Sequence, residues 1–418
     1  MARIRFGKNF LSDTSPEEVP TPQNTAGERA LPGEGEEAAP AVLLINGLLQ
    51  RGMEEGASDI HLEPFQQYAA IRIRIDGALV DCGQIDLEHH RSAVTRIKVL
   101  AQLDIAKHRI VQDGHFEADL KEGRVNIRVS VLPTLYGEKV VLRILADNVE
   151  ILHREQFGMS DEVYRRFVPL LRRRNGILYL TGPTGSGKST TMYLALQRVA
   201  EDTVNVTTIE DPVERSLERI NQVQVKPENG LTFSEGLRAV LRQDPDVIMV
   251  GETRDLETAK TSIHAAMTGH LVFSTLHTNG ALESVARLED MGIEPYDIAS
   301  AVIGFVAQRL VRRVCPHCGR AVAPTEEEQS RFGHTLSSVV RGAGCACCHG
   351  TGYLGRIAIH EMAVLDPALR TMILQKKSVD AMIDYACKHQ GMRRLWDSAA
   401  ELVRAGVTTP EEAETVSR

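Results

Sequence analysis

The residues with the clearest chemistry lie in Gly182–Ser189, which reads Gly-Pro-Thr-Gly-Ser-Gly-Lys-Ser. This matches G-x-x-x-x-G-K-[S/T], in which backbone N–H groups surround phosphates, the lysine reaches the β- and γ-phosphates and the last hydroxyl ligates Mg²⁺. An apolar run, Gly176–Thr181, precedes the loop, and Thr190–Ala200 has the pattern of a helix. Because the motif requires a strand before it and a helix after it, the sequence predicts a nucleotide site. Its residues would be Gly182, Pro183, Thr184, Gly185, Ser186, Gly187, Lys188, Ser189 and Thr190.

Two acidic clusters follow apolar runs further along the chain. Glu210 lies in the first cluster, and Glu252 ends an apolar run that has the pattern of a strand. Ligands of open α/β sheets bind at the carboxyl ends of strands, where a carboxylate can polarise water or hold Mg²⁺ through water. Many phosphate-loop enzymes carry an Asp just before this glutamate, but here the residue is Gly251. Direct ligation of Mg²⁺ is therefore expected from Ser189, the phosphates and water.

Two histidines flank the next apolar run, Leu271–Leu276. His270 precedes it and His277 follows it, so they lie at opposite ends of the expected strand and cannot form one ligand pair. His277 would lie at the carboxyl end, near the phosphates. The local residues leave two alternatives open for it, a structural hydrogen bond or a role in catalysis.

Four cysteines follow the spacing C-x-x-C…C-x-x-C, with 26 residues between the two pairs. Two such pairs in a reducing compartment predict a tetrahedral Zn²⁺ site with no open position, which makes it structural. The predicted ligands are Cys315, Cys318, Cys345 and Cys348. Cys347 competes for the last position, although the i, i+3 spacing favours Cys348. Free thiols or redox pairs are the alternative.

The composition describes an ordinary globular protein with more than one domain. The chain has 418 residues, of which 43% are hydrophobic and 25% charged, and a net charge of −8. This balance argues against nucleic acid as a bulk partner. The apolar runs are too short to span a bilayer, and the start lacks the apolar core of a signal peptide, so we expect a cytoplasmic protein.

Six segments are expected from the patterning. Alternation of apolar and polar residues, as in Ile71–Gly77 and Arg124–Val131, indicates a small sheet with one basic face. Strands that alternate with helices after Gly176 indicate an α/β domain with a parallel sheet. The expected segments are a disordered acidic Pro-rich tail (1–40), a small α+β domain (41–148), an arginine-rich linker helix (149–175), the nucleotide domain (176–312), a tetracysteine module (313–360) and a helical C-terminal region (361–418).

Over residues 41–418 the chain resembles the ATPases of type II secretion and type IV pilus assembly. No single motif carries the resemblance, but their order and spacing together are very specific. In addition to the phosphate loop, or Walker A motif, they are Ser58–Pro64, Leu103–Gly114, Leu132–Arg143, the aspartate box Glu210–Glu214, the Walker B end Gly251–Asp255, the histidine box Thr268–His277, and Gly350–Arg356 after the second cysteine pair.

The resemblance implies a hexameric ring of RecA-like P-loop NTPase domains, each preceded by a small α+β domain that is PAS-like. ATP, Mg²⁺ and Zn²⁺ would be its cofactors. By the family's pattern Glu252 activates water, Glu210 supports Mg²⁺ and the γ-phosphate, and His277 senses that phosphate. Arginines of the small domain would reach the γ-phosphate. Arg128 is the best candidate because it lies in the matching Arg-Val-Ser strand; Arg109 follows, then Arg72 or Arg74.

The implied partners are an inner-membrane platform protein and other parts of the secretion or pilus machinery, through which the protein would associate peripherally with the membrane. Two departures from the family's pattern stand out. His115 takes the place of the usual arginine after Gln-Asp-Gly, and an acidic tail stands where members usually carry a further N-terminal domain, so recruitment is expected to differ.

Three other functions remain as alternatives. A DNA-uptake pilus motor shares the same chemistry. A zinc-ribbon nucleic-acid binder that uses ATP as a switch is disfavoured by the acidic net charge. An inactive assembly scaffold is disfavoured because Lys188, Glu210 and Glu252 are all present. The tetracysteine module also argues against the retraction ATPases of pili, which lack it.

Overall fold

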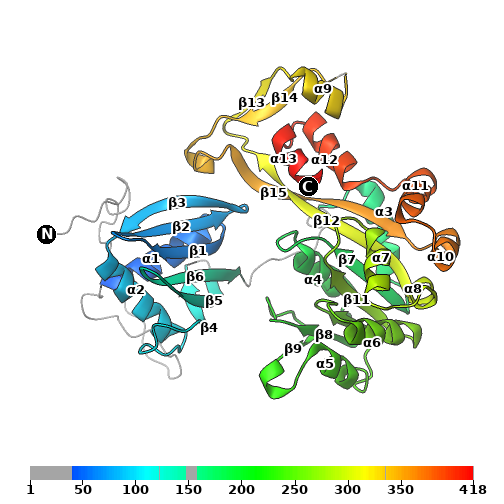
Figure 1. The fold of residues 1–418 in the computed structure, drawn as a ribbon, viewed down its shortest axis with the longest axis horizontal. Coiled ribbons are helices and arrows are strands. Elements are labelled where there is room, and N and C mark those ends of the chain that lie inside the picture. Colours follow the sequence, from blue (N-terminus) through cyan, green and yellow to red (C-terminus); the bar gives the residue numbers. More distant parts are fainter. Residues whose placement is uncertain (1–39, 122, 147–157, 335, 418) are drawn as a thin grey trace. The chain divides into compact units, whose positions relative to one another are not determined.

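A computed structural model of the chain describes residues 40–121, 123–146, 158–334 and 336–417 (Figure 1). The chain divides into two compact units, Met1–Val149 and Glu150–Arg418, which we call unit 1 and unit 2. The expected tail lies outside the described residues apart from its last residue, Pro40, and so do residues 149–157 of the expected linker helix. The described part of that segment forms a shorter helix, Asp161–Leu171.

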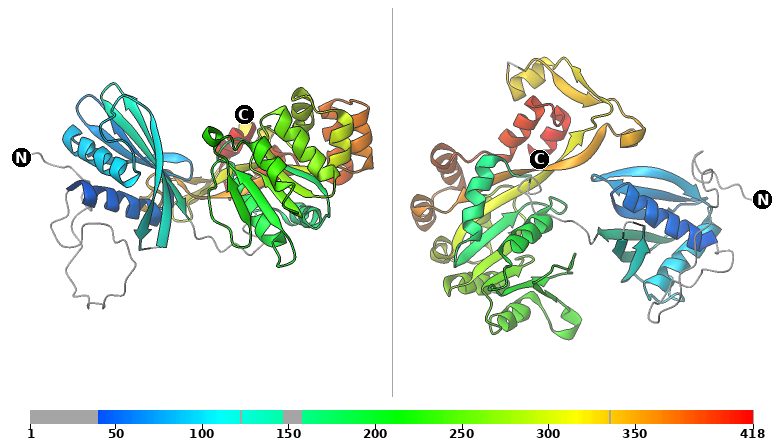
Figure 2. Two further views of the ribbon diagram at one scale, coloured as in Figure 1. Left: turned by 90° about the horizontal axis from the view of Figure 1, so that it is seen from below. Right: turned by 180° about the vertical axis from the view of Figure 1, so that it is seen from behind.

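Unit 1 is a six-stranded antiparallel sheet with the order β3-β2-β1-β6-β5-β4. Figure 2 shows both of its helices, α1 and α2, on the same face of this sheet. The elements are α1 (Pro40–Glu54), β1 (Ala57–Pro64), β2 (Ala69–Ile75), β3 (Ala78–Ile85), α2 (Leu87–Leu100), β4 (Gln112–Leu120), β5 (Gly123–Thr134) and β6 (Gly137–Ala146).

Strict alternation along the strands gives the sheet of unit 1 one apolar and one polar face. On β1, Ile60 and Leu62 are fully buried in the core under the helices, whereas Asp59, His61 and Glu63 point to the other face. The alternation noted in the sequence corresponds to β2 and β5. The mixed α/β fold class is confirmed, while the PAS-like character of unit 1 stays a prediction.

Unit 2 is built on a seven-stranded sheet with the order β15-β12-β7-β11-β10-β8-β9. The strands from β12 to β9 run parallel to one another, and β15 pairs antiparallel with β12. The strands are β7 (Gly176–Thr181), β8 (Val206–Glu210), β9 (Asn221–Gln224), β10 (Val247–Val250), β11 (Leu271–Leu276), β12 (Val302–Val314) and β15 (Tyr353–Val364).

Helices cover both faces of this sheet, as the alternation of strands and helices predicted. On β7, Leu178 and Leu180 pack under α3 (Asp161–Leu171) and α4 (Lys188–Val199), whereas Ile177 and Tyr179 join the larger core on the other face. Because successive residues of β7 are apolar on both faces, this strand is buried throughout. That larger core includes residues of α5 (Phe233–Val240), α6 (Leu256–Met267), α7 (Glu283–Asp290), α8 (Pro295–Ala301) and α12 (Leu395–Arg404).

The tetracysteine module is an insertion between two strands of the central sheet. It contains β13 (Gly319–Val322), α9 (Glu326–Phe332), β14 (Val339–Gly342) and the 3-10 helix η3 (Ala346–Cys348), and the chain then returns through β15. The nucleotide domain therefore extends beyond the expected boundary at residue 312. Local pattern could not reveal this, because β15 joins the sheet by pairing with a strand on the far side of the insertion.

The remaining described elements are η2 (Pro227–Asn229), α10 (Pro367–Leu374), α11 (Val379–Gln390), α13 (Pro410–Glu414) and η4 (Thr415–Ser417). In Figure 1 the C-terminal helices α12 and α13 lie beside the module with β13, β14 and α9. None of the helices in the described ranges has the length and apolar character needed to cross a bilayer.

Candidate nucleotide and metal sites

The phosphate loop leaves the carboxyl end of β7 and ends where α4 begins at Lys188. Gly182 and Gly187 have φ of 147° and 84°, a region that favours glycine. Both also lie against Gln308 of β12. A Cβ atom added to Gly182 would lie 2.5 Å from the Gln308 carbonyl oxygen, and one added to Gly187 would lie 2.8 Å from Gln308 Nε2. Close packing against Gln308 therefore leaves no room for a side chain at either glycine and holds the loop on β12.

Gln308 supports the loop although it belongs to none of the sequence motifs. It is 1% exposed, and its Nε2 donates to the Ser186 carbonyl at 2.8 Å. Its Oε1 accepts from Thr191 Oγ1 at 2.8 Å and lies 3.2 Å from Nε2 of His360. Burial lowers the pKa of His360 to about 3, so the ring is neutral and donates from Nε2. No local signal marks Gln308, because all three contacts join distant parts of the chain.

Lys188 is buried and points back over the loop. Its Nζ donates to the carbonyl oxygens of Gly182 at 2.6 Å and Pro183 at 3.0 Å. Burial is the main cause that lowers the pKa of Lys188 to about 8, and the positive charge of Arg309 adds to it. Glu252 acts in the opposite direction. A cation held in this way is stabilised when an anion arrives.

Glu210 ends β8 and is 4% exposed. Three uncharged groups hold its carboxylate: the Tyr193 hydroxyl donates to Oε2, while Thr208 Oγ1 and Gln222 Nε2 donate to Oε1 at 2.6 and 2.9 Å. Tyr193 also accepts from the Glu214 backbone N–H at 3.2 Å. No lysine or arginine within the described ranges forms an ion pair with Glu210, so its negative charge is oriented but not neutralised.

Glu252 and His277 lie together at the carboxyl ends of β10 and β11. Nε2 of His277 is 3.7 Å from Glu252 Oε2, and Arg254 Nε is 2.7 Å from the same oxygen. Burial lowers the pKa of His277, and the nearby charge of Lys188 adds to that effect. The structure thus brings Lys188, Glu252 and His277 to one edge of the sheet, as the motifs predicted.

Gly251 and His270 account for two further features of the sequence. A Cβ atom added to Gly251 would lie 3.2 Å from the Ile209 carbonyl oxygen, which already accepts the Gly251 N–H at 2.8 Å. The position therefore has little room for the Asp of other phosphate-loop enzymes. His270 lies at the opposite end of β11, where its Nδ1 contacts the Ala265 carbonyl at 2.9 Å, a structural hydrogen bond.

The candidate arginines lie on unit 1. Arg128 is exposed on the polar face of the sheet, directly opposite Arg143 on β6 and His115 on β4. Arg72 forms an ion pair with Glu63, and Arg74 is 4.0 Å from Asp59. Arg109 is exposed in the segment before β4. Within the residues that the structure covers, neither Arg128 nor Arg109 forms an ion pair, so their guanidinium groups are available.

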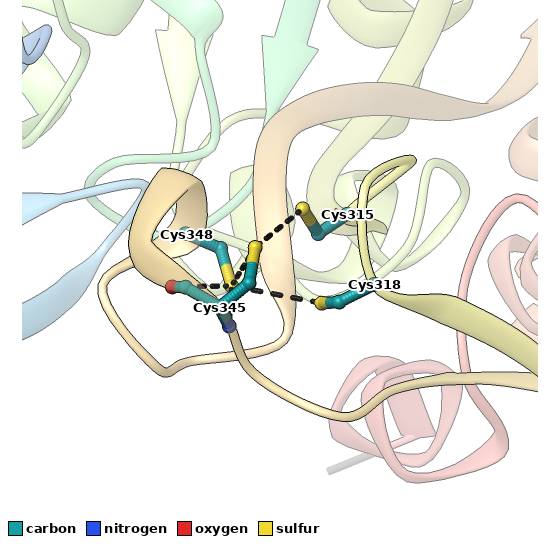
Figure 3. Close-up of side chains that lie close together, drawn as sticks. All are labelled: Cys315, Cys318, Cys345 and Cys348. Atoms are coloured by element: carbon teal, nitrogen blue, oxygen red, sulfur yellow. Dashed lines mark hydrogen bonds between the residues drawn. The ribbon is translucent and has the colours of Figure 1, made fainter.

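Figure 3 shows the sulfur atoms of the two cysteine pairs converging. All four lie within 4.8 Å of one another, and three of the separations are 3.8, 3.8 and 3.7 Å. Sulfur atoms bound to one Zn²⁺ at about 2.3 Å lie about 3.8 Å apart in a tetrahedron. Cys347 is exposed and outside the group, so the geometry selects Cys315, Cys318, Cys345 and Cys348.

Comparison with known proteins identifies the family of this chain. A family model described as "Type II/IV secretion system protein" matches residues 34–415. The chain belongs to this family. It is a member of the type II secretion and type IV pilus assembly ATPases, as the motifs predicted.

Several curated relatives support this assignment. The chain is 44% identical over 383 residues to the type II secretion system protein HxcR of Pseudomonas aeruginosa, covering 92% of this chain and 78% of the relative. It is 43% identical to type II secretion system ATPase E of Vibrio cholerae, with 92% and 77% covered. It is 42% identical to the type IV pilus assembly ATPase PilB of Thermus thermophilus, covering 97% of this chain and 45% of PilB.

Solved structures support the fold. The pilus retraction motor PilT with bound ADP matches with a TM-score of 0.60 and 26% identity over 89% of this chain and 96% of PilT. The Legionella pneumophila ATPase DotB matches with a TM-score of 0.66 at 22% identity, covering 92% of this chain and 97% of DotB, and therefore supports the fold alone.

Proposed function

We propose that this protein is a hexameric ATPase that powers assembly of a pseudopilus or pilus in a type II secretion or type IV pilus system. The observation that carries the proposal is the meeting of Lys188, Glu252 and His277 beside a phosphate loop, in a chain of the secretion ATPase family. The same constellation would serve a DNA-uptake pilus motor.

In this proposal the loop N–H groups and Lys188 bind the phosphates of ATP. Lys188 exchanges its two carbonyl partners for phosphate oxygens, which restores its proton affinity. Ser189 would ligate Mg²⁺ and Glu210 would support it, and the ion would neutralise charge at the phosphates. The carboxylate of Glu210 suits this role because its three hydrogen-bond donors are uncharged.

Glu252 is assigned to the attacking water. Its carboxylate accepts a proton from the water as the water oxygen bonds to the γ-phosphorus and the bond to the ADP oxygen breaks. His277, 3.7 Å from Glu252, would sense the γ-phosphate. Arg128 of unit 1 would supply the arginine that stabilises charge on the transferring phosphoryl group.

The wider assembly is part of the proposal. Six chains would form a ring, and nucleotide-driven movement of unit 1 against unit 2 would act on an inner-membrane platform protein. The protein would work in the cytoplasm and reach the membrane through such partners. Zn²⁺ bound by the four cysteines would hold the insertion between β12 and β15 in shape.

ATP hydrolysis by the full-length chain with Mg²⁺ tests the function. Wild-type protein should release phosphate steadily, and Lys188→Ala should reduce turnover at least about a hundredfold. Lys260→Ala on the exposed side of α6 is the matched control and should behave like wild type. Hydrolysis that persists in Lys188→Ala would contradict the proposed site.

Metal analysis tests the zinc assignment. Wild-type protein should contain about one zinc per chain, and Cys318→Ser should lose it and lower the thermal stability of the insertion. Cys347→Ser removes a cysteine outside the cluster and should keep the metal. Equal metal content in all three proteins would overturn the assignment.

A further inference from the structure

Arg309 lies where β12 passes the start of the phosphate loop. Ala307 pairs with Thr181, the last residue of β7, so the next residues of β12 run alongside the loop. Because side chains alternate along a strand, Gln308 supports the loop from the side of α4, and Arg309 emerges on the opposite side. Arg309 belongs to none of the sequence motifs.

The guanidinium group of Arg309 connects the loop with the segment that follows the histidine box. Its Nη2 donates to Asn279 Oδ1 at 3.1 Å and to the Asn279 carbonyl at 3.3 Å. Its Nη1 lies 3.3 Å from the position of a Cβ atom added to Gly182. Asn279 comes two residues after His277, so Arg309 lies beside the first glycine of the loop and bonds to the segment that follows the candidate γ-phosphate sensor.

The charge of Arg309 is not neutralised. Among the described residues no carboxylate lies within ion-pair distance of it, and Glu361 acts on it only from further away. Lys188 is in the same situation, because its Nζ donates to carbonyl groups of the loop. Lys188 is buried and Arg309 is half-buried, and after burial the positive charge of Arg309 is the main cause that lowers the pKa of Lys188. A multiply charged anion would relieve this repulsion.

We propose that Arg309 is a phosphate-binding residue of the same chain, a second cation beside Lys188 that recognises the triphosphate. The inference rests on the proposed ATP site and adds a residue to it. The guanidinium would contact phosphate oxygens while it keeps hold of Asn279, and so would couple phosphate binding to the segment after His277. Arg309 therefore belongs to the same unit as the phosphate loop, whereas the other candidate arginines lie on unit 1.

The competing interpretation is that Arg309 only holds Asn279 in place. Arg309 also lines a cavity of about 340 Å³ beside Asn279, Glu361 and Arg394, and in this interpretation it is only part of the wall of that cavity. The two interpretations differ in how binding depends on phosphate charge. A phosphate contact discriminates between nucleotides by their number of phosphates, whereas a structural support affects all nucleotides alike.

Equilibrium binding of fluorescent ATP, ADP and AMP analogues to the full-length protein tests the proposal, in low and high salt. Arg309→Gln should weaken ATP binding about tenfold, ADP binding less and AMP binding little, and should reduce the salt dependence for ATP. Arg309→Lys should recover part of the ATP affinity because it keeps the charge. Arg313→Gln, an exposed arginine further along β12, should match wild type.

Asn279→Ala separates the two interpretations, since it removes the side-chain partner of Arg309 and keeps the cation. Under the proposal its ATP affinity stays within about twofold of wild type. Equal losses of affinity for ATP and AMP in Arg309→Gln would overturn the proposal. A loss of ATP affinity in Asn279→Ala as large as that in Arg309→Gln would also overturn it.

If Arg309→Gln fails to fold, the comparison uses Arg309→Lys instead. An ATP affinity of Arg309→Lys below that of Asn279→Ala supports the proposal, and the reverse order overturns it. Wild-type protein that binds no ATP would instead remove the proposed function.

Discussion

The buried carboxylates of Asp59 and Glu63 in unit 1 and of Glu210 in unit 2 lie in opposite electrostatic surroundings. On the polar face of unit 1, Asp59 accepts from Arg143 at 2.9 Å, and Glu63 contacts both Arg72 and Lys139. In unit 2, Glu210 is held by uncharged donors only. Burial of an acid therefore does not by itself mark a site. Pairing with cations neutralises the charge and stabilises the fold, whereas neutral donors orient the carboxylate and leave its charge for a ligand.

Glu252 lies between these two cases. Arg254 forms an ion pair with it, but the Arg254 side chain is 72% exposed, so water screens that contact. The other neighbour, His277, has a pKa lowered first by burial and is therefore mostly neutral at pH 7. The negative charge of Glu252 thus remains available for the attacking water.

The largest expected effect comes from Glu252→Gln. The amide keeps the shape of the side chain but cannot accept a proton, so turnover should fall about 10²- to 10⁴-fold while ATP binding persists. Phosphate release and nucleotide binding measured on the same sample check this. Glu294→Gln, an exposed glutamate before α8, is the control. Near-normal hydrolysis in Glu252→Gln would remove Glu252 from the chemistry.

Tyr193→Phe should have a smaller effect on the same edge. It removes the hydroxyl that orients Glu210 Oε2 and accepts from Glu214 N–H, and so should lower turnover about tenfold. If Glu210 supports Mg²⁺, the variant should also need more Mg²⁺ for half-maximal rate. Tyr296→Phe changes an exposed tyrosine and should leave both quantities alone. An unchanged Mg²⁺ requirement in Tyr193→Phe would separate Glu210 from the metal.

Proton uptake should accompany ATP binding because the pKa of Lys188 in the protein without nucleotide is about 8. The protonated form binds the triphosphate, so affinity should be full below pH 8 and fall as the pH rises through that value. Calorimetry at pH 8.5 in two buffers of different ionisation enthalpy should give different binding enthalpies. Identical enthalpies would show that Lys188 is already fully charged in the free protein.

The smallest effect on activity is expected from Glu63→Gln in unit 1. Burial alone would raise the pKa of Glu63, but hydrogen bonds from Lys139 and Arg72 outweigh burial and hold it below its usual value. Its stabilising contribution is therefore present above pH 4.5 and is lost as the pH falls through the lowered pKa.

Glu63→Gln should cost about 1 to 2 kcal/mol in the unfolding free energy at pH 7, because both cations remain partly solvated. Denaturant unfolding of the variant measures this cost, and the difference from wild type should shrink in acid. The basal ATPase rate should not change. If Glu63→Gln lowers the ATPase rate as much as Tyr193→Phe does, then carboxylates paired with cations and Glu210 do not differ in function as described.

The parts that sequence could predict are those encoded locally. The phosphate loop, the acids at strand ends and the cysteine pairs each lie within short segments, and the structure places them where the motifs required. Gln308, His360 and Tyr193 were missed because their roles depend on contacts between strands and helices far apart in the chain. The edge strand β15 was missed for the same reason, since the insertion separates it from its partner β12.

The most direct test of the account is ATPase rate per chain against protein concentration, with oligomer mass read in parallel. Wild type, Arg128→Ala and Arg91→Ala, a control in α2 on the helical side of unit 1, should be compared. We predict that the rate per chain climbs as hexamers form, that Arg128→Ala abolishes the rise, and that Arg91→Ala does not. A rate independent of oligomer state and of Arg128 would contradict a ring motor completed by the arginine of unit 1.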